Sequence, residues 1–330
     1  MIDLTTTYLG LTLQNPVVAS ASPLSRDLDT VKRLEDNGVS ALVMDSLFEE
    51  EILHDQHELH THTQMGTESF AESLSYFPMH ESYEMFGEDY LERLYQLKRT
   101  LSVPVIASLN GHTPGGWVRF AEMFEEAGAD ALELNVYFLP TDPGETPQDV
   151  EGRYVEILRS VKSRVRIPVA MKLGPFFSAF ANMAQQLQSA KADGLVLFNR
   201  FYQPDIDLED MCLEPSVLLS TPQAMRLPLR WIAILRNQID ISLAATSGVH
   251  SGADVIKMIL VGADVTQMAS ALLIRGPEHI AEVLTHVRAW MEEREYESVT
   301  QMKGSMSYAH VPDPGAYERA NYMRALRGFR

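Results

Sequence analysis

Two loops rich in small residues near the end of the chain have the composition of a phosphate site. One is the Ala-Thr-Ser-Gly-Val-His-Ser-Gly run at residues 245–252, and the other is the Gln-Met-Ala-Ser-Ala-Leu-Leu run at residues 267–273. Each follows a short apolar run and opens a segment of helical period. Small residues let backbone N–H groups approach a phosphate, and the start of a helix favours negative charge. We therefore predict that these loops hold a phosphate group.

Three polar side chains, Asn135, Lys172 and Asn199, stand at the ends of other apolar runs. An ammonium in such a position needs an anionic or electron-rich partner to offset its desolvation. An amide can hydrogen-bond a planar heterocycle. The alternatives are a lysine that reaches solvent and asparagines that satisfy buried backbone groups. Because three strand ends carry such residues, we expect them to form one binding site.

The elements that must position these residues alternate along the chain. Eight short apolar runs predict strands at residues 17–20, 41–44, 105–108, 131–135, 168–172, 194–198, 242–245 and 265–268. Segments of helical period lie at residues 27–37, 116–127, 148–161, 179–189 and 254–260. Fully apolar runs are typical of parallel strands covered on both faces. Eight such units favour an α/β fold of the (β/α)8 TIM barrel type; an open doubly wound sheet is the alternative.

We expect a single domain over residues 1–330, with long loops on the C-terminal face of the barrel. Residues 46–86 and 200–227 interrupt the repeat as loop insertions, and residues 298–330 form a C-terminal extension. Loops that follow barrel strands line the active-site face, so the two insertions are candidate substrate covers. The run at residues 319–323 predicts a docked helix that packs on a partner subunit or closes the barrel.

Composition excludes several classes of partner. The 330 residues include 27 Lys+Arg and 45 Asp+Glu, which gives a net charge of −18. This balance argues against nucleic acid and against an anionic membrane surface. Cys212 is the only cysteine, so no intrachain disulfide can form. No apolar run approaches the ~18 residues that span a bilayer, and no signal peptide is evident. We expect a cytoplasmic protein that binds a small molecule.

Several phrases resemble a known family. They are Leu9-Gly10-Leu11, Asn15-Pro16-Val17-Val18-Ala19-Ser20, Glu133-Leu134-Asn135, Met171-Lys172-Leu173, Phe198-Asn199 and the two small-residue loops. From Leu9 to about Ile280, the sequence resembles the flavin-dependent dihydroorotate dehydrogenases of the soluble class 1 type. The resemblance implies a (β/α)8 barrel, FMN as cofactor, a homodimer, and hydride transfer from a dihydropyrimidine-like substrate to FMN in pyrimidine biosynthesis.

The resemblance also implies a set of site residues. Ser247, Gly248, Ala269 and Ser270 would hold the FMN phosphate through backbone amides, and Lys172 would contact the isoalloxazine and ribityl region. Asn135 and Asn199 would lie between flavin and substrate. The cofactor-binding set is then Ala19, Ser20, Asp45, Ser46, Lys172, Asn199, Ser247, Gly248, Ala269 and Ser270.

The sequence departs from the family pattern at three places. The family has Asn-x-Ser-Cys-Pro-Asn after the fourth strand, with Cys or Ser as the base, but here that position falls on Phe138 or Leu139, which cannot take a proton. Where the family has Lys-Ser, this chain has Asp45-Ser46, and a carboxylate there would disfavour reduced flavin and an acidic substrate. The substrate loop carries Glu72 where an amide is expected. We therefore expect weak or no oxidation of dihydroorotate.

Replacement bases are present in loops after strands. Tyr137 is the candidate that we assign to the catalytic set with Lys172, Asn135 and Asn199. The others are His112, Thr141, Asp142 and His250. Separately, a histidine-rich segment contains His54, His57, His60 and His62 beside carboxylates. Its spacing matches no established metal motif, and we predict no metal site, with a solvated polar segment as the simpler interpretation.

Two alternatives to a flavin enzyme follow from these departures. The chain would be a flavin-free barrel relative that acts as a ligand-binding or regulatory protein, since fold does not determine function. It would otherwise be a barrel enzyme whose two loops hold a phosphorylated substrate. Bound FMN separates the first interpretation from both alternatives.

Overall fold

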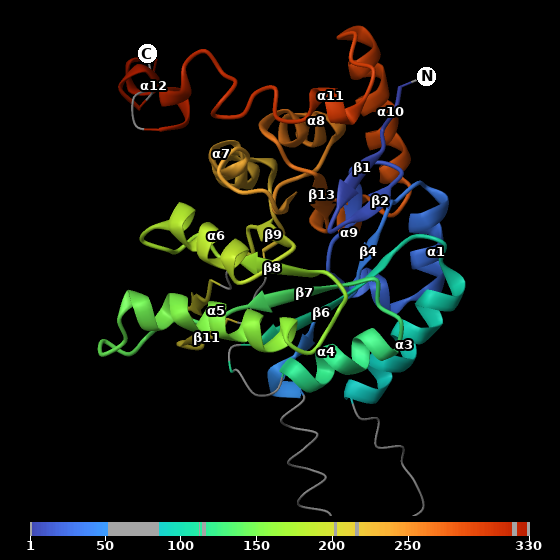
Figure 1. Ribbon diagram of the computed structural model, residues 1–330, viewed down its shortest axis with the longest axis vertical. Helices are drawn as coiled ribbons and strands as arrows, with labels where there is room; N and C mark the ends of the chain where they lie inside the picture. The colour runs from blue at the N-terminus through green and yellow to red at the C-terminus, as the bar shows by residue number, and fades with distance from the viewer. Residues whose placement is uncertain are drawn as a thin grey trace, which may run out of the picture.

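Eight parallel strands form a closed barrel at the centre of the molecule (Figure 1). The computed structural model describes residues 2–51, 86–111, 113, 117–200, 203–214, 218–318 and 322–328. Around the barrel the strands are β3 (Val17–Ala19), β4 (Leu42–Val43), β6 (Val105–Gly111), β7 (Ala131–Val136), β8 (Val169–Leu173), β9 (Gly194–Leu197), β12 (Ser242–Ala245) and β13 (Val265–Met268). The β13–β3 and β4–β6 pairings close the ring. The predicted (β/α)8 TIM barrel is confirmed, and the open sheet is excluded.

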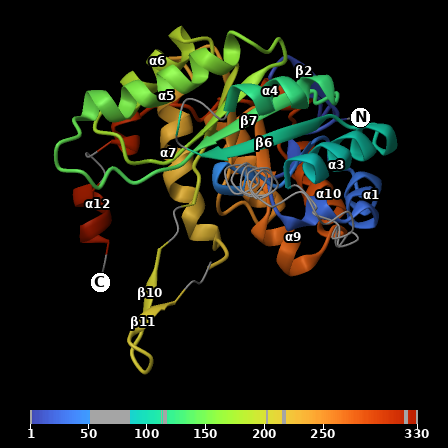
Figure 2. The same cartoon turned by 90° about the horizontal axis from the view of Figure 1, so that it is seen from below.

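Helices surround this barrel and cover the outer faces of its strands (Figures 1 and 2). They are α1 (Leu28–Asp36), α3 (Phe86–Thr100), α4 (Trp117–Glu126), α5 (Pro147–Lys162), α6 (Phe180–Ser189), α7 (Arg226–Leu235), α8 (Gly252–Val261), the short α9 (Ser270–Arg275) and α10 (His279–Glu293). The five predicted helices are α1, α4, α5, α6 and α8, each within two residues of the expected ends. Helices α3, α7, α9 and α10 were not predicted; α3 and α7 directly follow the two polar insertions.

Local sequence explains where several helices start and stop. Helix α5 begins with a capping box, because Thr146 accepts a hydrogen bond from the Asp149 N–H and the Asp149 side chain accepts one from the Thr146 N–H. Asp27 caps α1 by accepting from the Thr30 N–H. Helix α8 ends at Gly262, whose φ of 117° is left-handed.

The interior of the barrel is divided into an apolar layer and a polar layer. At the N-terminal end of the strands, small and branched side chains meet the antiparallel hairpin β1 (Thr6–Tyr8) and β2 (Leu11–Leu13), which plugs the barrel. Nearer the C-terminal ends, the inward positions become polar and charged, and Glu133 and Lys172 are both buried. Glu133 and Lys172 therefore lie on the side where barrel enzymes carry their sites.

The described parts of the two insertions form short strands in addition to loops. The described start of the first adds the short strand β5 (Leu47–Phe48) to β6, and residues 52–85 lie outside the described part. In the second, the hairpin of β10 (Asp205–Asp207) and β11 (Cys212–Glu214) projects away from the barrel (Figure 2). Of the described residues of this insertion, Arg200, Gln203 and 218–220 line the cleft described below. The interpretation of this insertion as a candidate substrate cover therefore stays a prediction, carried by the residues at its two ends and not by the hairpin.

The C-terminal extension packs on the outside of the barrel. Its helix α11 (Val299–Met302) and the following turn bond to the ends of α7 and α8, through Gly304 N to Ile259 O and Tyr308 N to Ala233 O, at 3.0 and 2.9 Å. Helix α12 (Tyr322–Arg327) lies at the edge of the molecule near the C-terminus (Figure 1), and Tyr322 is 62% exposed. This helix does not close the barrel; the β1–β2 hairpin does. Among the described helices, none is both long and apolar enough to cross a bilayer.

Candidate cofactor and substrate site

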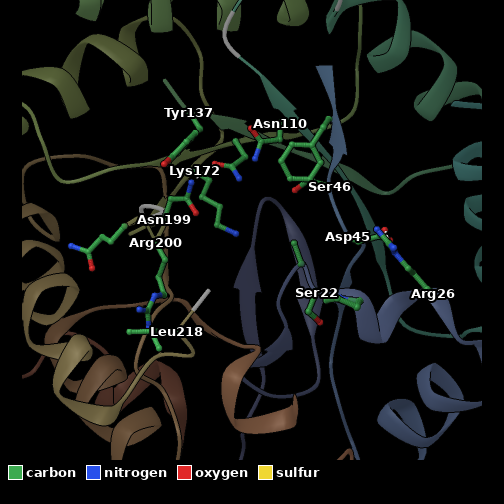
Figure 3. Close-up of a pocket in the computed structure, with 15 residues that line it drawn as sticks. Ser22, Arg26, Asp45, Ser46, Asn110, Tyr137, Lys172, Asn199, Arg200 and Leu218 are labelled. Atoms are coloured by element: carbon green, nitrogen blue, oxygen red, sulfur yellow. Dashed lines mark hydrogen bonds and ion pairs between the residues drawn. The ribbon is translucent and has the colours of Figure 1, made fainter. Parts of the chain in front are cut away.

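A cleft opens where the barrel strands end at their C-termini. Its larger part has a volume of about 460 Å³ and its smaller part about 230 Å³. Lys172, Asn199, Arg200 and Leu218 line both parts, so the two are continuous. The size falls in the range typical of small-molecule sites, about 300–1,000 Å³. Figure 3 shows the larger part, with side chains directed into it from several strands.

The three predicted strand-end residues converge on the larger part of the cleft. Asn135 near the end of β7, Lys172 in β8 and Asn199 after β9 all line it. Lys172 and Asn199 lie close together in Figure 3. Asn199 Nδ2 donates to Asn135 Oδ1 at 2.8 Å, which orients both amides. The geometry thus brings together residues that are 64 and 27 positions apart in the sequence.

The Lys172 ammonium is bound by Glu133, a residue that was not among the site residues predicted from the sequence. Its Nζ donates to Glu133 Oε1 at 3.0 Å, and Gln267 Nε2 donates to Glu133 Oε2 at 2.9 Å. Gln267 Oε1 accepts from Ser20 Oγ at 3.1 Å. The sequence signal for Glu133 was a charged residue at an inward position of an apolar strand, two residues before Asn135.

The predicted phosphate loops line the smaller part of the cleft. Ser247, Gly248, Ala269 and Ser270 all border it. Ser247 and Gly248 are both left-handed, with φ of 69° and 81°, and tight turns of this kind gather backbone N–H groups into anion-binding concavities. Ser247 is held in this conformation because its Oγ donates to Phe198 O at 2.9 Å. A strained serine at such a point is a sign of function.

Ser220, at the end of the second insertion, connects the two loops. Its N–H donates to Ser270 Oγ at 3.0 Å, and its Oγ accepts from the Gly248 N–H at 3.3 Å. The His250 ring also contacts Ser220 Oγ at 3.2 Å, and partial burial lowers the pKa of His250. Sequence reasoning missed Ser220 because it lies about 30 residues from one loop and 50 from the other.

Asp45 does not present a bare negative charge to the cleft. Its carboxylate accepts from Arg26 Nε at 2.7 Å and from Ser25 Oγ at 2.8 Å, and Arg93 Nη2 lies at 3.5 Å. In Figure 3 the Asp45 and Arg26 side chains point toward each other, away from Lys172. Two guanidinium groups therefore stand beside this carboxylate and offset part of its charge, and the expectation that it repels anionic groups stays a prediction. Ser46 next to it lines the cleft and bonds Ser108 Oγ at 2.8 Å.

Of the described base candidates, only Tyr137 reaches the cleft. It follows Asn135 by two residues and lines the larger part. Phe138, at the family's base position, packs instead under the Arg153 guanidinium at 4.3 Å, and Leu139 is exposed.

The other base candidates lie outside the cleft lining or outside the described residues. Asp142 caps the Gly144 N–H, Thr141 is exposed, and His250 is turned toward Ser220. His112 and the histidine-rich segment with His54, His57, His60 and His62 lie outside the described residues. Within the part of the chain that the structure describes, no three metal-ligating side chains cluster.

The cleft fits a phosphorylated, planar cofactor such as FMN. One end carries the two small-residue turns, and the other carries an ammonium and two oriented amides. Gly248 is required at its position, because a Cβ there would lie 2.4 Å from Met225 N. This close packing brings the segment with Ser220 against the loop. The residues present therefore match the polarity that FMN has from its phosphate to its ring.

Fold and site together define a (β/α)8 barrel with a cleft at its C-terminal face, lined at one end by two turns of small residues. The sequence profile of the dihydroorotate dehydrogenase family matches residues 79–291. The catalytic subunit of dihydroorotate dehydrogenase B (NAD(+)) from Thermoplasma volcanium is 27% identical over 313 residues, which cover 92% of this chain and 98% of that protein. A putative dihydroorotate dehydrogenase A (fumarate) from Aeropyrum pernix is 30% identical over 66% of this chain and 71% of that protein.

The profile match covers more than half of the chain. The protein therefore belongs to the dihydroorotate dehydrogenase family. It is accordingly a dihydroorotate dehydrogenase-like oxidoreductase of the class that acts on CH–CH bonds.

Proposed function

We propose that the protein is an FMN-dependent oxidoreductase that acts on a CH–CH bond of a small planar substrate of the dihydropyrimidine class. The observation that carries this proposal is the single continuous cleft, with two phosphate-type turns at one end and Lys172, Asn135 and Asn199 at the other. Family membership supports the same chemistry and a place in pyrimidine biosynthesis.

The phosphate end has a defined set of donors. Ser247, Ala269 and Ser270 would hold the phosphate of FMN through backbone N–H groups. Gly248 would line this site while its own N–H donates to Ser220 Oγ, the contact that helps tie the two loops together. Lys172 lines both parts of the cleft, so it would contact the cofactor between its phosphate and its ring. When bound, FMN supplies a ring that accepts or returns a hydride.

The substrate end is formed by amides and one phenol. Asn135 and Asn199 are already oriented by their mutual hydrogen bond, and so would position a planar ring with little reorganisation. Tyr137 comes from the loop where the family carries its base, and its hydroxyl is the group that we assign to hold the proton exchanged with substrate carbon. Phe138 and Leu139 would serve only to shape the neighbouring surface.

The structure weakens one of the two arguments for the flavin-free alternative. That alternative was motivated by Asp45, at a position where a lysine is expected, and by the absence of the family's base. Arg26 and Ser25 bind that carboxylate within 2.8 Å, so a cation stands beside the negative charge at the cleft wall and offsets part of it. The family relatives are likewise dehydrogenases by name. The flavin enzyme is therefore the function that the site supports best.

An anaerobic half-reaction tests the proposal. FMN-loaded protein would be mixed with dihydroorotate or with uncharged dihydrouracil, and the flavin absorbance followed in time. We expect both to reduce the flavin, with dihydroorotate slower than ~1 s⁻¹, a low rate for an enzyme, because the usual base is absent. Protein that takes up no FMN would contradict the function. Rapid reduction by dihydroorotate would instead show that the substrate of the family is retained.

Tyr137→Phe is expected to slow flavin reduction about 100-fold, in the range typical of lost acid–base catalysis. The rate is measured with whichever of dihydroorotate and dihydrouracil reduces the wild type faster. FMN affinity should stay unchanged, because the hydroxyl is assigned to the substrate end. Tyr154→Phe is the matched control, since Tyr154 packs against Phe138 and Phe177 and does not line the cleft. Equal rates in Tyr137→Phe and the wild type would remove Tyr137 from the mechanism.

A further inference from the structure

Four polar side chains from four different strands form a hydrogen-bonded chain across the barrel beneath the cleft. Ser20 follows β3, Gln267 is in β13, Glu133 in β7 and Lys172 in β8. The bonds run from Ser20 Oγ to Gln267 Oε1, from Gln267 Nε2 to Glu133 Oε2, and from Lys172 Nζ to Glu133 Oε1, at 3.1, 2.9 and 3.0 Å. Both carboxylate oxygens of Glu133 are therefore engaged.

Packing does not explain why the barrel holds an ion pair at this level. Glu133 is 1% exposed and Lys172 6% exposed, so both charges are withdrawn from water. Burying two ions costs more than apolar packing unless their geometry and hydrogen bonds are good, and such pairs are often replaceable by apolar residues. The core cluster below consists of aliphatic side chains and Tyr8, with Ala131 and Ala170 two residues earlier on the same two strands. The same strands thus pack well without charge.

The pair differs from a structural ion pair because one partner faces the cleft. Lys172 lines both parts of the cleft, and Gln267 lines the smaller part, whereas Glu133 lines neither. The Lys172 ammonium can therefore contact a ligand directly. The Glu133 carboxylate next to it offsets part of the positive charge at the ligand. Asp45, whose carboxylate does line the larger part, forms ion pairs with Arg26 and Arg93.

We propose that Glu133 is a positioning residue for Lys172, which holds the ammonium at the cleft floor and offsets its charge, so that this pair sets the reduction potential of the bound flavin. The proposal rests on the proposed FMN site. With both partners present, the floor carries no net charge. Removing one partner leaves a single charge near the flavin ring. In the low dielectric of the barrel interior, this charge interacts strongly with the ring.

The sign of each effect follows from charge alone. Reduction adds electrons to the flavin, so a floor with net positive charge favours it and a floor with net negative charge opposes it. Glu133→Gln leaves the ammonium and should raise the reduction potential. Lys172→Met leaves the carboxylate and should lower it. The double variant is neutral again and should return close to the wild-type value.

The test is the midpoint potential of bound FMN in the wild type, both single variants and the double variant. Each single variant should change the reduction equilibrium about tenfold in opposite directions, which is about 30 mV for a two-electron couple. Lys162→Met is the matched control, because it removes the same charge from the ion pair with Asp193, at the opposite ends of the strands; it should leave the potential unchanged.

The outcomes separate this inference from the function on which it rests. FMN bound with an unchanged potential in both single variants would overturn the role of Glu133 while leaving the flavin enzyme intact. Shifts of the same sign would also overturn it. Absence of FMN from the wild type would overturn both. If Glu133→Gln does not fold, the test uses the other two variants. The midpoint potential should then fall in Lys172→Met and return to the wild-type value in the neutral double variant.

Discussion

Gly248→Ala is expected to weaken FMN binding strongly, with an increase in the Kd for FMN of at least 100-fold. A Cβ at this residue would lie 2.4 Å from Met225 N and 2.9 Å from Thr221 O, and both are backbone atoms that cannot turn aside. The left-handed φ of 81° adds conformational strain of its own. Relieving the collision must displace the segment that carries Ser220, and with it the bonds that tie the two phosphate loops together.

Fluorescence titration of FMN-free protein with FMN measures this effect, and Gly10→Ala is the matched control. Gly10 is also left-handed, with φ of 76°, but no atom lies within 4 Å of the added Cβ. That variant should lose roughly 1 kcal/mol of stability from strain and bind FMN normally. If Gly248→Ala bound FMN like the wild type, the small-residue loop would not be the phosphate site.

Glu133→Gln is expected to lower the free energy of unfolding by about 3–5 kcal/mol, the usual effect of leaving one member of a buried ion pair alone. The Lys172 ammonium would then be buried without its counter-charge, 3.0 Å from a neutral amide. The double variant Glu133→Gln with Lys172→Met should recover most of this loss, because no uncompensated charge remains. Urea unfolding of the FMN-free proteins gives the four free energies of the cycle.

An exposed ion pair provides the comparison for this cycle. Glu122 lies 3.7 Å from Arg164, and both side chains are well exposed. Glu122→Gln should change the free energy of unfolding by less than about 1 kcal/mol, because solvent screens the pair. Additive losses in the Glu133 and Lys172 cycle, with the double variant the least stable, would mean that the two charges do not stabilise each other.

The fold could be predicted from the sequence because its signals are local. Each barrel strand is a short run of apolar residues, since strands of a closed parallel barrel are covered by helices outside and by side chains inside. The runs at 131–135 and 168–172 became β7 and β8 almost unchanged. Helices were harder where they adjoin an insertion, as with α3 and α7, because the polar composition of the insertion obscures where the helical period begins.

The site could be predicted only in part, for a physical reason. Asn135, Lys172 and Asn199 each end a predicted strand, and the barrel geometry then places them together without further information. The partners that decide their chemistry come from distant contacts. Glu133 was visible as a charge within an apolar run, but nothing in its spacing indicates that it binds Lys172 and Gln267.

Asp45 shows how a distant contact changes the meaning of a substitution. From sequence, an aspartate beside the cofactor is an argument against an anionic ligand. In the folded chain Arg26, 19 residues earlier, binds the same carboxylate, and Arg93 adds a second cation. The charge at this side of the cleft therefore depends on Asp45, Arg26 and Arg93 together. Comparison with the family pattern pointed only to Asp45.

The absorption spectrum of the freshly purified protein, followed by denaturation and identification of any released chromophore, tests the central claim most directly. The account predicts a flavin spectrum and close to one equivalent of FMN per chain, or stoichiometric uptake when FMN is added to colourless protein. Protein that is colourless and does not bind added FMN would contradict the account. The two loops around Ser220 would then have to hold a different phosphorylated ligand.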